Sequence, residues 1–236
     1  MQFPGFKSLI QYFFDLFFPH TCAACGSSNL AGKDGICAFC LANLPKTGFL
    51  AKAGNRVEEI FWGRLAIEHA AACCFFAKKT PVQRVLHELK YRHRADSGVQ
   101  LGEWMGHELA KTDWFAEIDL IIPMPLHPKR KAVRGYNQAE LLCSGISKTT
   151  GKLHFPKALV RNTATRSQTK QNRHERWDNM QGVFAIADPE LLKSKHILLV
   201  DDVVTTGATL EAMGQKLLEI HQLKLSICCF AYTAKI

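Results

Sequence analysis

Short, nearly continuous apolar runs alternate along this chain with segments whose apolar positions recur every three or four residues. The runs predict strands, and they read AIEHAAACCFF, IDLIIPMP, GVFAIA, HILLVDD and LKLSICCFAYT. The spaced segments predict helices over about 80–94, 98–110, 137–150 and 209–221, with Pro81 in a first turn and Gly151 as a helix cap. Apolar strands that alternate with helices indicate a mainly parallel sheet covered on both faces, an α/β fold.

The first fifty residues do not follow this alternation. Over residues 1–20 the apolar side chains recur on one helical face, which predicts an amphipathic helix. Its apolar stretch is far shorter than the ~20 residues that span a membrane. We therefore expect the helix to dock on the protein or a partner, with attachment to a membrane surface as the alternative. Residues 21–50 predict a small module rich in Gly, Ser, Asn and Cys, and residues 51–236 form the main domain.

Composition and charge narrow the function classes. Hydrophobic residues make up 47% of the 236 positions and charged residues 22%, which is ordinary for a soluble globular protein. Lys and Arg exceed Asp and Glu by 30 − 21 = +9, a bias that suits an anionic partner such as a polyphosphate or a nucleic acid, although a basic protein without a special partner has the same balance. The nine cysteines are odd in number and no cleavable signal is visible, so we expect a cytoplasmic protein and not a secreted disulfide scaffold.

Four of these cysteines form two C-x-x-C pairs, Cys22 with Cys25 and Cys37 with Cys40. Two such pairs complete a tetrahedral sulfur site, so they predict a structural Zn²⁺ with no open position for catalysis. A redox dithiol is the alternative for either pair taken alone. The remaining cysteines lie in apolar segments and are expected to be small buried hydrophobes: Cys73, Cys74, Cys143, Cys228 and Cys229.

The stretch ILLVDDVVTTGAT, residues 197–209, places two carboxylates at the end of a predicted buried strand and follows them with a hydroxyl-rich loop. Two buried charges are costly unless something binds them. Gly207 permits a tight turn around an anion, and the amides at the following helix start would point at a phosphate. The carboxylates suit ribose hydroxyls or a hydrated Mg²⁺. An aspartate helix cap alone would explain one acid but not both.

This stretch resembles the 5-phosphoribosyl-1-pyrophosphate (PRPP) motif of type I phosphoribosyltransferases. The resemblance implies that Asp201 and Asp202 bind the ribose diol and that the following loop surrounds the 5-phosphate. The implied PRPP-binding residues are Asp201, Asp202, Val203, Val204, Thr205, Thr206, Gly207, Ala208 and Thr209.

Two further segments extend the match. RGYNQAELL, residues 134–142, closely resembles the competence-associated ComF family, which also carries an N-terminal four-cysteine zinc module. The segment just before it looks like a pyrophosphate loop, with Lys129, Arg130, Lys131, Arg134 and Gly135 as its implied residues. Residues 161–184 resemble the mobile hood of that family, with Arg161, Thr165, Gln168 and Arg176 as implied site residues. The family implies a type I phosphoribosyltransferase fold and a role in DNA uptake and natural transformation.

Phosphoribosyl transfer requires a positioned sugar and a neutralised pyrophosphate, and no nucleophilic side chain. The resemblance makes Asp201, Asp202 and Arg134 the catalytic residues, with Mg²⁺ bound alongside PRPP. In purine-salvage relatives a third acid lies beside the base, but this chain has Thr205 there. That difference disfavours purine salvage, and an orotate-type or other nucleobase phosphoribosyltransferase is the alternative function.

A second hypothesis comes from a different class, a protein of the DNA-uptake pathway that retains a PRPP pocket and binds single-stranded DNA. Basic residues interleaved with an aromatic ring suit a single strand. The candidate contacts are Lys90, Tyr91, Arg92 and Arg94, although the same residues also fit a solvated helix face. Proteins of the DNA-uptake machinery are expected partners, and the sequence does not give the acceptor base or the oligomeric state.

Overall fold

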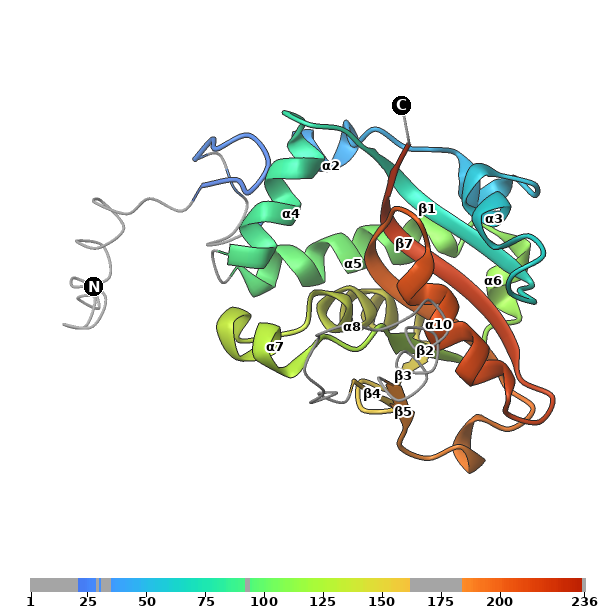
Figure 1. Ribbon diagram of the computed structural model, residues 1–236. Coiled ribbons are helices and arrows are strands. Elements are labelled where there is room, and N and C mark those ends of the chain that lie inside the picture. Colours follow the sequence, from blue (N-terminus) through green and yellow to red (C-terminus); the bar gives the residue numbers. More distant parts are fainter. Residues whose placement is uncertain (1–20, 29, 31–34, 92–93, 162–183, 235–236) are drawn as a thin grey trace, which may run out of the picture.

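The computed structural model describes residues 21–28, 30, 35–91, 94–161 and 184–234. At its centre is a five-stranded sheet in the order β1 (His69–Phe76), β7 (Lys224–Thr233), β6 (His196–Val204), β2 (Leu120–Pro123) and β3 (Leu153–His154) (Figure 1). Every neighbouring pair in this sheet is parallel. The predicted parallel α/β architecture is therefore confirmed.

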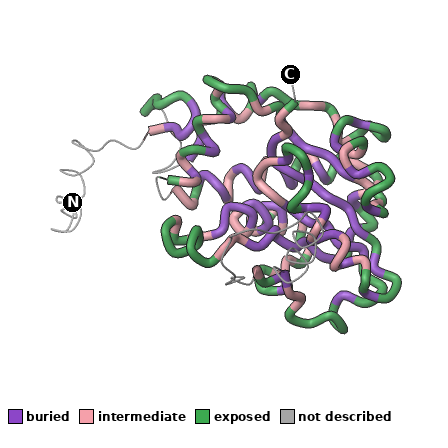
Figure 2. Tube along the Cα trace, in the orientation of Figure 1, coloured by how far each residue is buried: buried purple, intermediate pink, exposed green. Residues whose placement is uncertain are grey.

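Helices cover both faces of the sheet. Alternate residues of β6 point to opposite sides, so that Leu198 and Val200 belong to one buried cluster and Ile197 and Leu199 to the other. The first cluster includes side chains of α4 (Pro81–Tyr91), α5 (Ala95–Leu109) and α8 (Gln138–Thr150), and the second those of α3 (Arg56–Phe61) and α10 (Ala208–Leu218). Figure 2 shows the resulting buried centre with exposed residues around it. The shorter elements are α2 (Ala38–Ala42), α6 (Asp113–Ala116), α7 (Pro128–Arg134), η1 (Phe49–Ala51) and η2 (Glu190–Leu192).

Most predicted elements are present with shifted ends. Pro81 begins α4, and Gly151 ends α8 in the left-handed conformation with φ 73°. The helix predicted from residue 98 already begins at Ala95, and the one predicted to end at 221 ends at Leu218. The predicted strand GVFAIA contributes β5 (Phe184–Ile186), which pairs antiparallel with β4 (Leu159–Arg161) outside the main sheet.

The crossing of α5 and α8 is unusually close because both helices present glycine. A Cβ atom added at Gly102 would lie 2.9 Å from the Cα atom of Gly145 and would overlap the carbonyl oxygen of Leu142. A Cβ atom added at Gly145 would lie 2.5 Å from the backbone nitrogen of Glu103. Only glycine permits this approach, which holds α8 against the sheet beside β2 and β6.

The outer edge of β1 is covered by the segment 45–55. The backbone N–H of Thr47 donates to the carbonyl of Cys73 at 3.0 Å, and the N–H of Phe75 donates to the carbonyl of Pro45 at 2.8 Å. Further along, the side-chain amide of Asn55 donates to the carbonyl of Ala70 at 2.8 Å. These bonds satisfy backbone groups that an edge strand would otherwise leave open.

The amphipathic helix predicted over residues 1–20 lies outside the described residues. Within the part of the chain that the structure describes, no helix has the length and apolar character needed to cross a bilayer.

Candidate functional site

Asp201 and Asp202 lie near the carboxyl end of β6, between β7 and β2. The backbone N–H of Asp202 donates to Oδ1 of Asp201 at 2.8 Å. The Nζ atom of Lys90, from the last turn of α4, lies 2.6 Å from Oδ2 of Asp202. Both side chains of this ion pair are largely enclosed, with 26% and 16% of their surfaces exposed. Asp202 therefore forms an ion pair with a lysine that belongs to a different element, α4.

Burial and the neighbouring charge of Asp202 raise the pKa of Asp201 to about 8, against the smaller opposing effects of the Asp202 N–H and of Lys90. At neutral pH Asp201 thus retains its proton. A ligand hydroxyl or a cation placed beside these two side chains would replace solvation that the fold has removed.

The loop after β6 is open to solvent on its hydroxyl side and closely packed on the other. Thr205, Thr206 and Thr209 are exposed, whereas Gly207 is buried in the left-handed conformation with φ 72°. A Cβ atom at Gly207 would lie 2.6 Å from Cγ2 of Ile60 on α3. The glycine is required by this contact as well as by its backbone angle.

Helix α10 begins directly after Gly207, which has no side chain to cap it, and the N–H of Ala208 donates to Oγ1 of Thr206 at 3.5 Å. The first N–H groups of a helix lack intrahelical partners and carry the positive end of the helix dipole. An anion held in the threonine loop would accept hydrogen bonds from these groups. The phosphate-binding turn expected from the sequence stays a prediction.

The predicted pyrophosphate loop is largely helical, since Lys129, Arg130, Lys131 and Arg134 all lie on α7 and Gly135 ends it with φ 79°. This helix follows β2, the strand next to β6. The Nη1 atom of Arg134 donates to Oε1 of Gln138 at 2.8 Å, and its guanidinium lies 5.8 Å from the centre of the Tyr91 ring. The basic segment and the acidic pair therefore occupy the ends of neighbouring parallel strands.

Residues of the RGYNQ motif fasten α4 to this corner. The hydroxyl of Tyr136 donates to the carbonyl of Leu89 at 2.8 Å, and Nε2 of Gln138 donates to the same carbonyl at 3.2 Å. Asn137 accepts from the N–H of Ala139, which caps α8, and donates to the carbonyl of Met124 at 2.9 Å. Because Leu89 precedes Lys90, the motif sets the position of the cation at Asp202.

Of the four implied site residues of the hood, Arg161 at the end of β4 is the one that the structure describes. Its guanidinium lies 5.3 Å from the centre of the Phe184 ring, and its Nε atom is buried without a hydrogen-bond partner among the described residues. Burial and the charge of Arg130 lower the pKa of Arg161, and the charge of Asp201 opposes this. Arg161 therefore interacts electrostatically with the basic helix α7, through Arg130, and with the acidic pair, through Asp201. Thr165, Gln168 and Arg176 lie outside the described residues.

The predicted nucleic-acid contacts do not form one free basic surface. Lys90 is paired with Asp202, and Nε of Arg94 lies 3.3 Å from Oε2 of Glu88. Arg94 also donates to the backbone carbonyl of Thr21. Tyr91 is 61% exposed, and Arg92 lies outside the described residues. Sequence reasoning missed the position of Lys90 in the acidic site, because the pairing depends on how α4 ends against β6.

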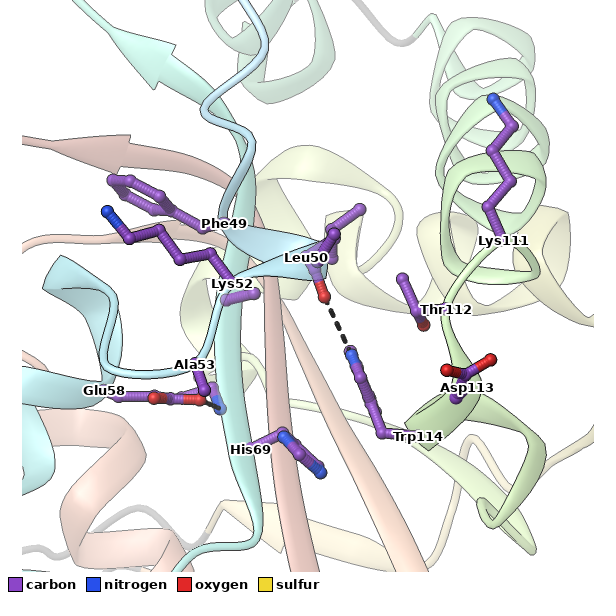
Figure 3. A pocket seen from close by; sticks show the side chains of 13 residues that line it. Phe49, Leu50, Lys52, Ala53, Glu58, His69, Lys111, Thr112, Asp113 and Trp114 are labelled. Atoms are coloured by element: carbon purple, nitrogen blue, oxygen red, sulfur yellow. Dashed lines mark hydrogen bonds between the residues drawn. The ribbon is translucent and has the colours of Figure 1, made fainter.

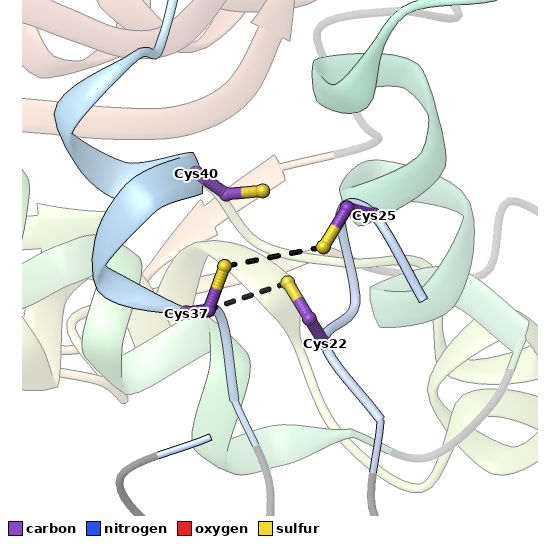
Figure 4. Close-up of side chains that lie close together, drawn as sticks. All are labelled: Cys22, Cys25, Cys37 and Cys40. Atoms are coloured by element: carbon purple, nitrogen blue, oxygen red, sulfur yellow. Dashed lines mark hydrogen bonds between the residues drawn. The ribbon is translucent and has the colours of Figure 1, made fainter. Parts of the chain in front are cut away.

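The four cysteines of the C-x-x-C pairs converge, with all their sulfur atoms within 4.8 Å of one another (Figure 4). The backbone N–H groups of Ala24 and Cys37 donate to Sγ of Cys22 at 3.4 and 3.3 Å. Burial opposes thiol ionisation, but these N–H donors lower the pKa of Cys22 to about 6. Burial and the neighbouring thiols raise the pKa of Cys40. Four thiolates at this spacing repel one another unless a cation joins them, so the cluster fits a tetrahedral metal ion such as zinc.

The cysteine module is held on α5 by Gln100. Its Oε1 atom accepts from the N–H of Ile36 at 2.6 Å, and its Nε2 atom donates to the carbonyl of Ile36 at 2.9 Å. Cys22, Ile36 and Cys40 are buried in the same cluster as side chains of α4 and α5. The module and the main domain therefore share a hydrophobic core. The five other cysteines are free and buried, as predicted.

A cavity of about 320 Å³ is lined by η1 and by the first residues of β1 (Figure 3). The indole N–H of Trp114 donates to the carbonyl of Leu50 at 2.9 Å across this cavity, and the indole stacks on His69 with ring centres 5.0 Å apart. Because β1 begins there, the cavity lies away from the carboxyl ends of the strands and from Asp201.

Comparison with known proteins adds to this geometry. The family model described as "Phosphoribosyl transferase domain" matches residues 147–235. "DNA utilization protein YhgH" of Escherichia coli O157:H7 is 27% identical over 231 residues, which are 91% of this chain and 98% of that protein. "Competence protein F" of Haemophilus influenzae is 24% identical over 226 residues, 85% of this chain and 92% of that protein. "Competence protein ComFC" of Bacillus subtilis is 32% identical over 100 residues, 42% of this chain and 38% of that protein.

Among solved structures, the glutamine PRPP amidotransferase of B. subtilis is similar with 18% identity and a TM-score of 0.40, over 57% of this chain and 26% of that one. A hypoxanthine phosphoribosyltransferase of Staphylococcus aureus has 14% identity and a TM-score of 0.34, over 57% of this chain and 62% of that one. The family-model match and the parallel sheet together confirm the fold class expected from the sequence.

Proposed function

We propose that this chain is a member of the ComF family, that it binds PRPP together with Mg²⁺ at the carboxyl end of β6, and that it acts in DNA utilisation in the cytoplasm. The observation that supports the proposal best is the pair Asp201 and Asp202, placed before an open threonine loop whose Gly207 packs against α3. The curated relatives carry competence and DNA-utilisation names, which support the wider role.

Each part of the ligand has a matching group on this chain. The carboxylates of Asp201 and Asp202 would accept hydrogen bonds from the two ribose hydroxyls, which requires Asp201 to release or share its proton. The amides of residues 206–209 and the hydroxyls of the loop would surround the 5-phosphate. Arg134, with the lysines of α7, would face the pyrophosphate.

The donor set at the end of β6 also fits Mg²⁺, a hard cation that prefers carboxylate and phosphate oxygens. Bound Mg²⁺ would supply positive charge to the pyrophosphate. In the free protein, the ammonium of Lys90 already balances the negative charge of Asp202 before any ligand binds. In the cysteine module, we assign zinc a structural role because four protein sulfurs leave no open position.

Transfer of the phosphoribosyl group to a nucleobase is the second candidate function. Positive side chains on α7 beside the sugar site are what a departing pyrophosphate needs. Thr205 occupies the position of the third acid of purine-salvage enzymes, so an acceptor that depends on this acid is disfavoured.

Isothermal titration of the zinc-loaded protein with PRPP and Mg²⁺ tests the proposal. We expect the double variant Asp201→Ala with Asp202→Ala to lose at least about 100-fold in affinity, because two charge-assisted contacts disappear. The control removes the same number of acidic side chains from an exposed surface near the start of β2, Asp113→Ala with Glu117→Ala. Unchanged PRPP binding by the first variant would refute the site assignment.

An assay of pyrophosphate release against a panel of bases separates binding from transfer. Release with one base would establish the transferase function. Tight binding without release from any base would make the pocket a sensor of PRPP.

A further inference from the structure

A groove of about 690 Å³ opens beside the threonine loop, at the carboxyl ends of β1 and β7. Its lining includes residues of η1, the turn after it, the start of α3 with its N-cap, and the two strand ends: Phe49, Lys52, Asn55, Arg56, Phe75 and Tyr232. None of them is assigned to PRPP binding above.

Three aromatic rings form one wall of the groove. The ring centres of Phe49 and Phe75 are 5.6 Å apart in an edge-to-face arrangement, and the ring of Tyr232 lies 6.0 Å from Phe49 and 6.5 Å from Phe75. Phe75, the penultimate residue of β1, is 40% exposed although the five residues before it are buried. Exposed aromatic faces at a groove are stacking platforms for planar rings.

The rim of the groove carries positive charge. Lys52 is exposed and Arg56 has 71% of its side chain in solvent. Among the described residues that line the groove, the only acidic side chain is that of Glu59, which lies 3.4 Å from Arg56 in an exposed pair. Phe49 and Lys52 also belong to the lining of the cavity in Figure 3, so η1 and the residue after it present ring and charge together. Cations beside aromatic rings suit a ligand with planar bases on an anionic backbone.

Two contacts place the groove next to the sugar-phosphate loop. In the register of β6 and β7, Tyr232 pairs with Val204, the residue before Thr205. Helix α3 and its N-cap contribute Arg56 and Asn55 to the groove, and the helix packs Ile60 against Gly207 of the loop. The loop and the groove therefore share two supporting elements.

We infer that this groove binds single-stranded DNA, with bases stacked on Phe75 and Tyr232 and with phosphates against Lys52 and Arg56. The inference rests on the proposed role in DNA utilisation but not on PRPP binding, so the two can fail separately. It replaces the end of α4 as the contact surface, because Lys90 and Arg94 are engaged in ion pairs there.

Fluorescence anisotropy of the full zinc-loaded chain with a labelled oligothymidylate of about 20 nucleotides tests the inference at several salt concentrations. We expect Phe75→Ala and Tyr232→Ala each to weaken binding at least about 5-fold, the effect of one lost base stack. We expect Lys52→Glu with Arg56→Glu to weaken binding and to reduce the slope of log affinity against log salt by about 1 to 2.

Matched controls are available at other surfaces. Phe39→Ala removes a ring that is 74% exposed on α2, and Lys195→Glu reverses an exposed charge at the opposite end of β6. Both controls should bind the oligonucleotide like the unchanged protein. Because Lys52 and Arg56 are exposed, their variant keeps the test valid even if a ring variant fails to fold.

Three outcomes would overturn the inference. The unchanged protein does not bind the oligonucleotide, or the groove variants bind as it does, or Lys195→Glu weakens binding as much as the groove variants. Equal competition by thymidine monophosphate and by the oligonucleotide would assign the groove to a single nucleotide instead. PRPP titration of the same variants reports separately on the neighbouring loop.

Discussion

Asp201 and Asp202 are adjacent in the chain but differ in their electrostatic surroundings. Asp202 faces the ammonium of Lys90, whereas Asp201 is enclosed between strands and carries the raised pKa. Asp201 is thus protonated and Asp202 is paired with Lys90, so the two neighbouring carboxyl groups do not repel each other as two free negative charges would. A ligand that needs both carboxylates must displace that proton.

The raised pKa of Asp201 predicts that the free protein loses stability as pH rises from about 4 to about 8. The folded state keeps the Asp201 proton up to about pH 8, whereas the unfolded chain releases it near the ordinary value of 3.8. The folded state therefore binds more protons in this window, and stability falls as pH increases through it. We expect Asp201→Asn to raise the Tm at pH 8 by about 2–4 °C or more and to have little effect at pH 4. Thermal melts of both proteins across this range measure it, and an equal difference at both pH values would contradict the assignment.

Lys90→Met tests whether Lys90 serves the acidic site or a nucleic-acid surface. The substitution keeps the length of the side chain but leaves Asp202 without its cation, in a site that must receive an anionic ligand. We expect the affinity for PRPP with Mg²⁺ to fall about 10-fold, equivalent to about 1.4 kcal/mol. The salt dependence of oligonucleotide binding should not change. A reduced salt slope with unchanged PRPP affinity would return Lys90 to the nucleic-acid surface.

At the scale of single residues, the sequence predicted the chemistry of the strand end but not its electrostatic partner. The order of acids, threonines and glycine from 201 to 209 is a local pattern, and the structure places it in one strand, one turn and one helix start. The contact of Lys90 with Asp202 joins residues more than a hundred positions apart. No local pattern encodes such a pairing.

At the scale of elements, the pairing of α5 with α8 depends on glycines. Gly98, Gly102 and Gly106 recur every four residues along α5 and meet α8 at different distances. A Cβ atom at Gly106 would lie 3.0 Å from Cβ of Thr149 and 3.2 Å from Cα of Ile146, contacts that a shift of a few tenths of an ångström relieves, whereas one at Gly102 would overlap the carbonyl oxygen of Leu142. The helix geometry is therefore most constrained at its centre.

Gly102→Ala and Gly106→Ala form a matched pair on the same helix. Alanine favours a helix interior by about 1 kcal/mol over glycine, so any loss of stability comes from the contact. We expect Gly102→Ala to lower the free energy of unfolding by about 1–3 kcal/mol through overpacking, and Gly106→Ala to be close to neutral. Denaturant unfolding with constant m-values checks this. Equal effects of the two substitutions would show that the close approach at Gly102 is not the cause.

Elements with strong periodicity or long apolar runs were predictable, and short ones were not. Apolar residues recur often enough to identify the helices α4 and α8, and the apolar runs of the strands β6 and β7 are long enough to identify them. Pro81 marks the start of α4, and Gly151 marks the end of α8. Strand β3 has two residues and exists because β2 offers an open edge. The placement of β5 in a hairpin follows from pairing with β4, which sequence spacing does not determine.

At the scale of the whole molecule, the cysteine module is part of the main fold. Gln100 reaches from α5 to both backbone groups of Ile36, and Arg94 reaches Thr21. The sequence predicted two units at residues 21–50 and 51–236 because composition changes there. The shared core shows that stability crosses this boundary.

Loss of the metal should therefore destabilise the entire chain. We expect one equivalent of zinc per chain by elemental analysis, and a fall in Tm of more than about 5 °C in a single transition on chelation or in Cys40→Ser. Cys143→Ala, which alters a buried cysteine of α8, should retain the zinc. Zinc retention by Cys40→Ser, or melting of the module alone while the sheet remains folded, would contradict this prediction.

The covered edge of β1 limits how this chain can associate with others. With segment 45–55 bonded along it, an extended peptide or a second sheet cannot add there without first displacing that segment. Growth of the sheet in the other direction would have to start from the two residues of β3. A partner that joins by strand addition therefore finds almost no template on the five-stranded sheet, and a partner at this sheet must be recognised through side chains and loops.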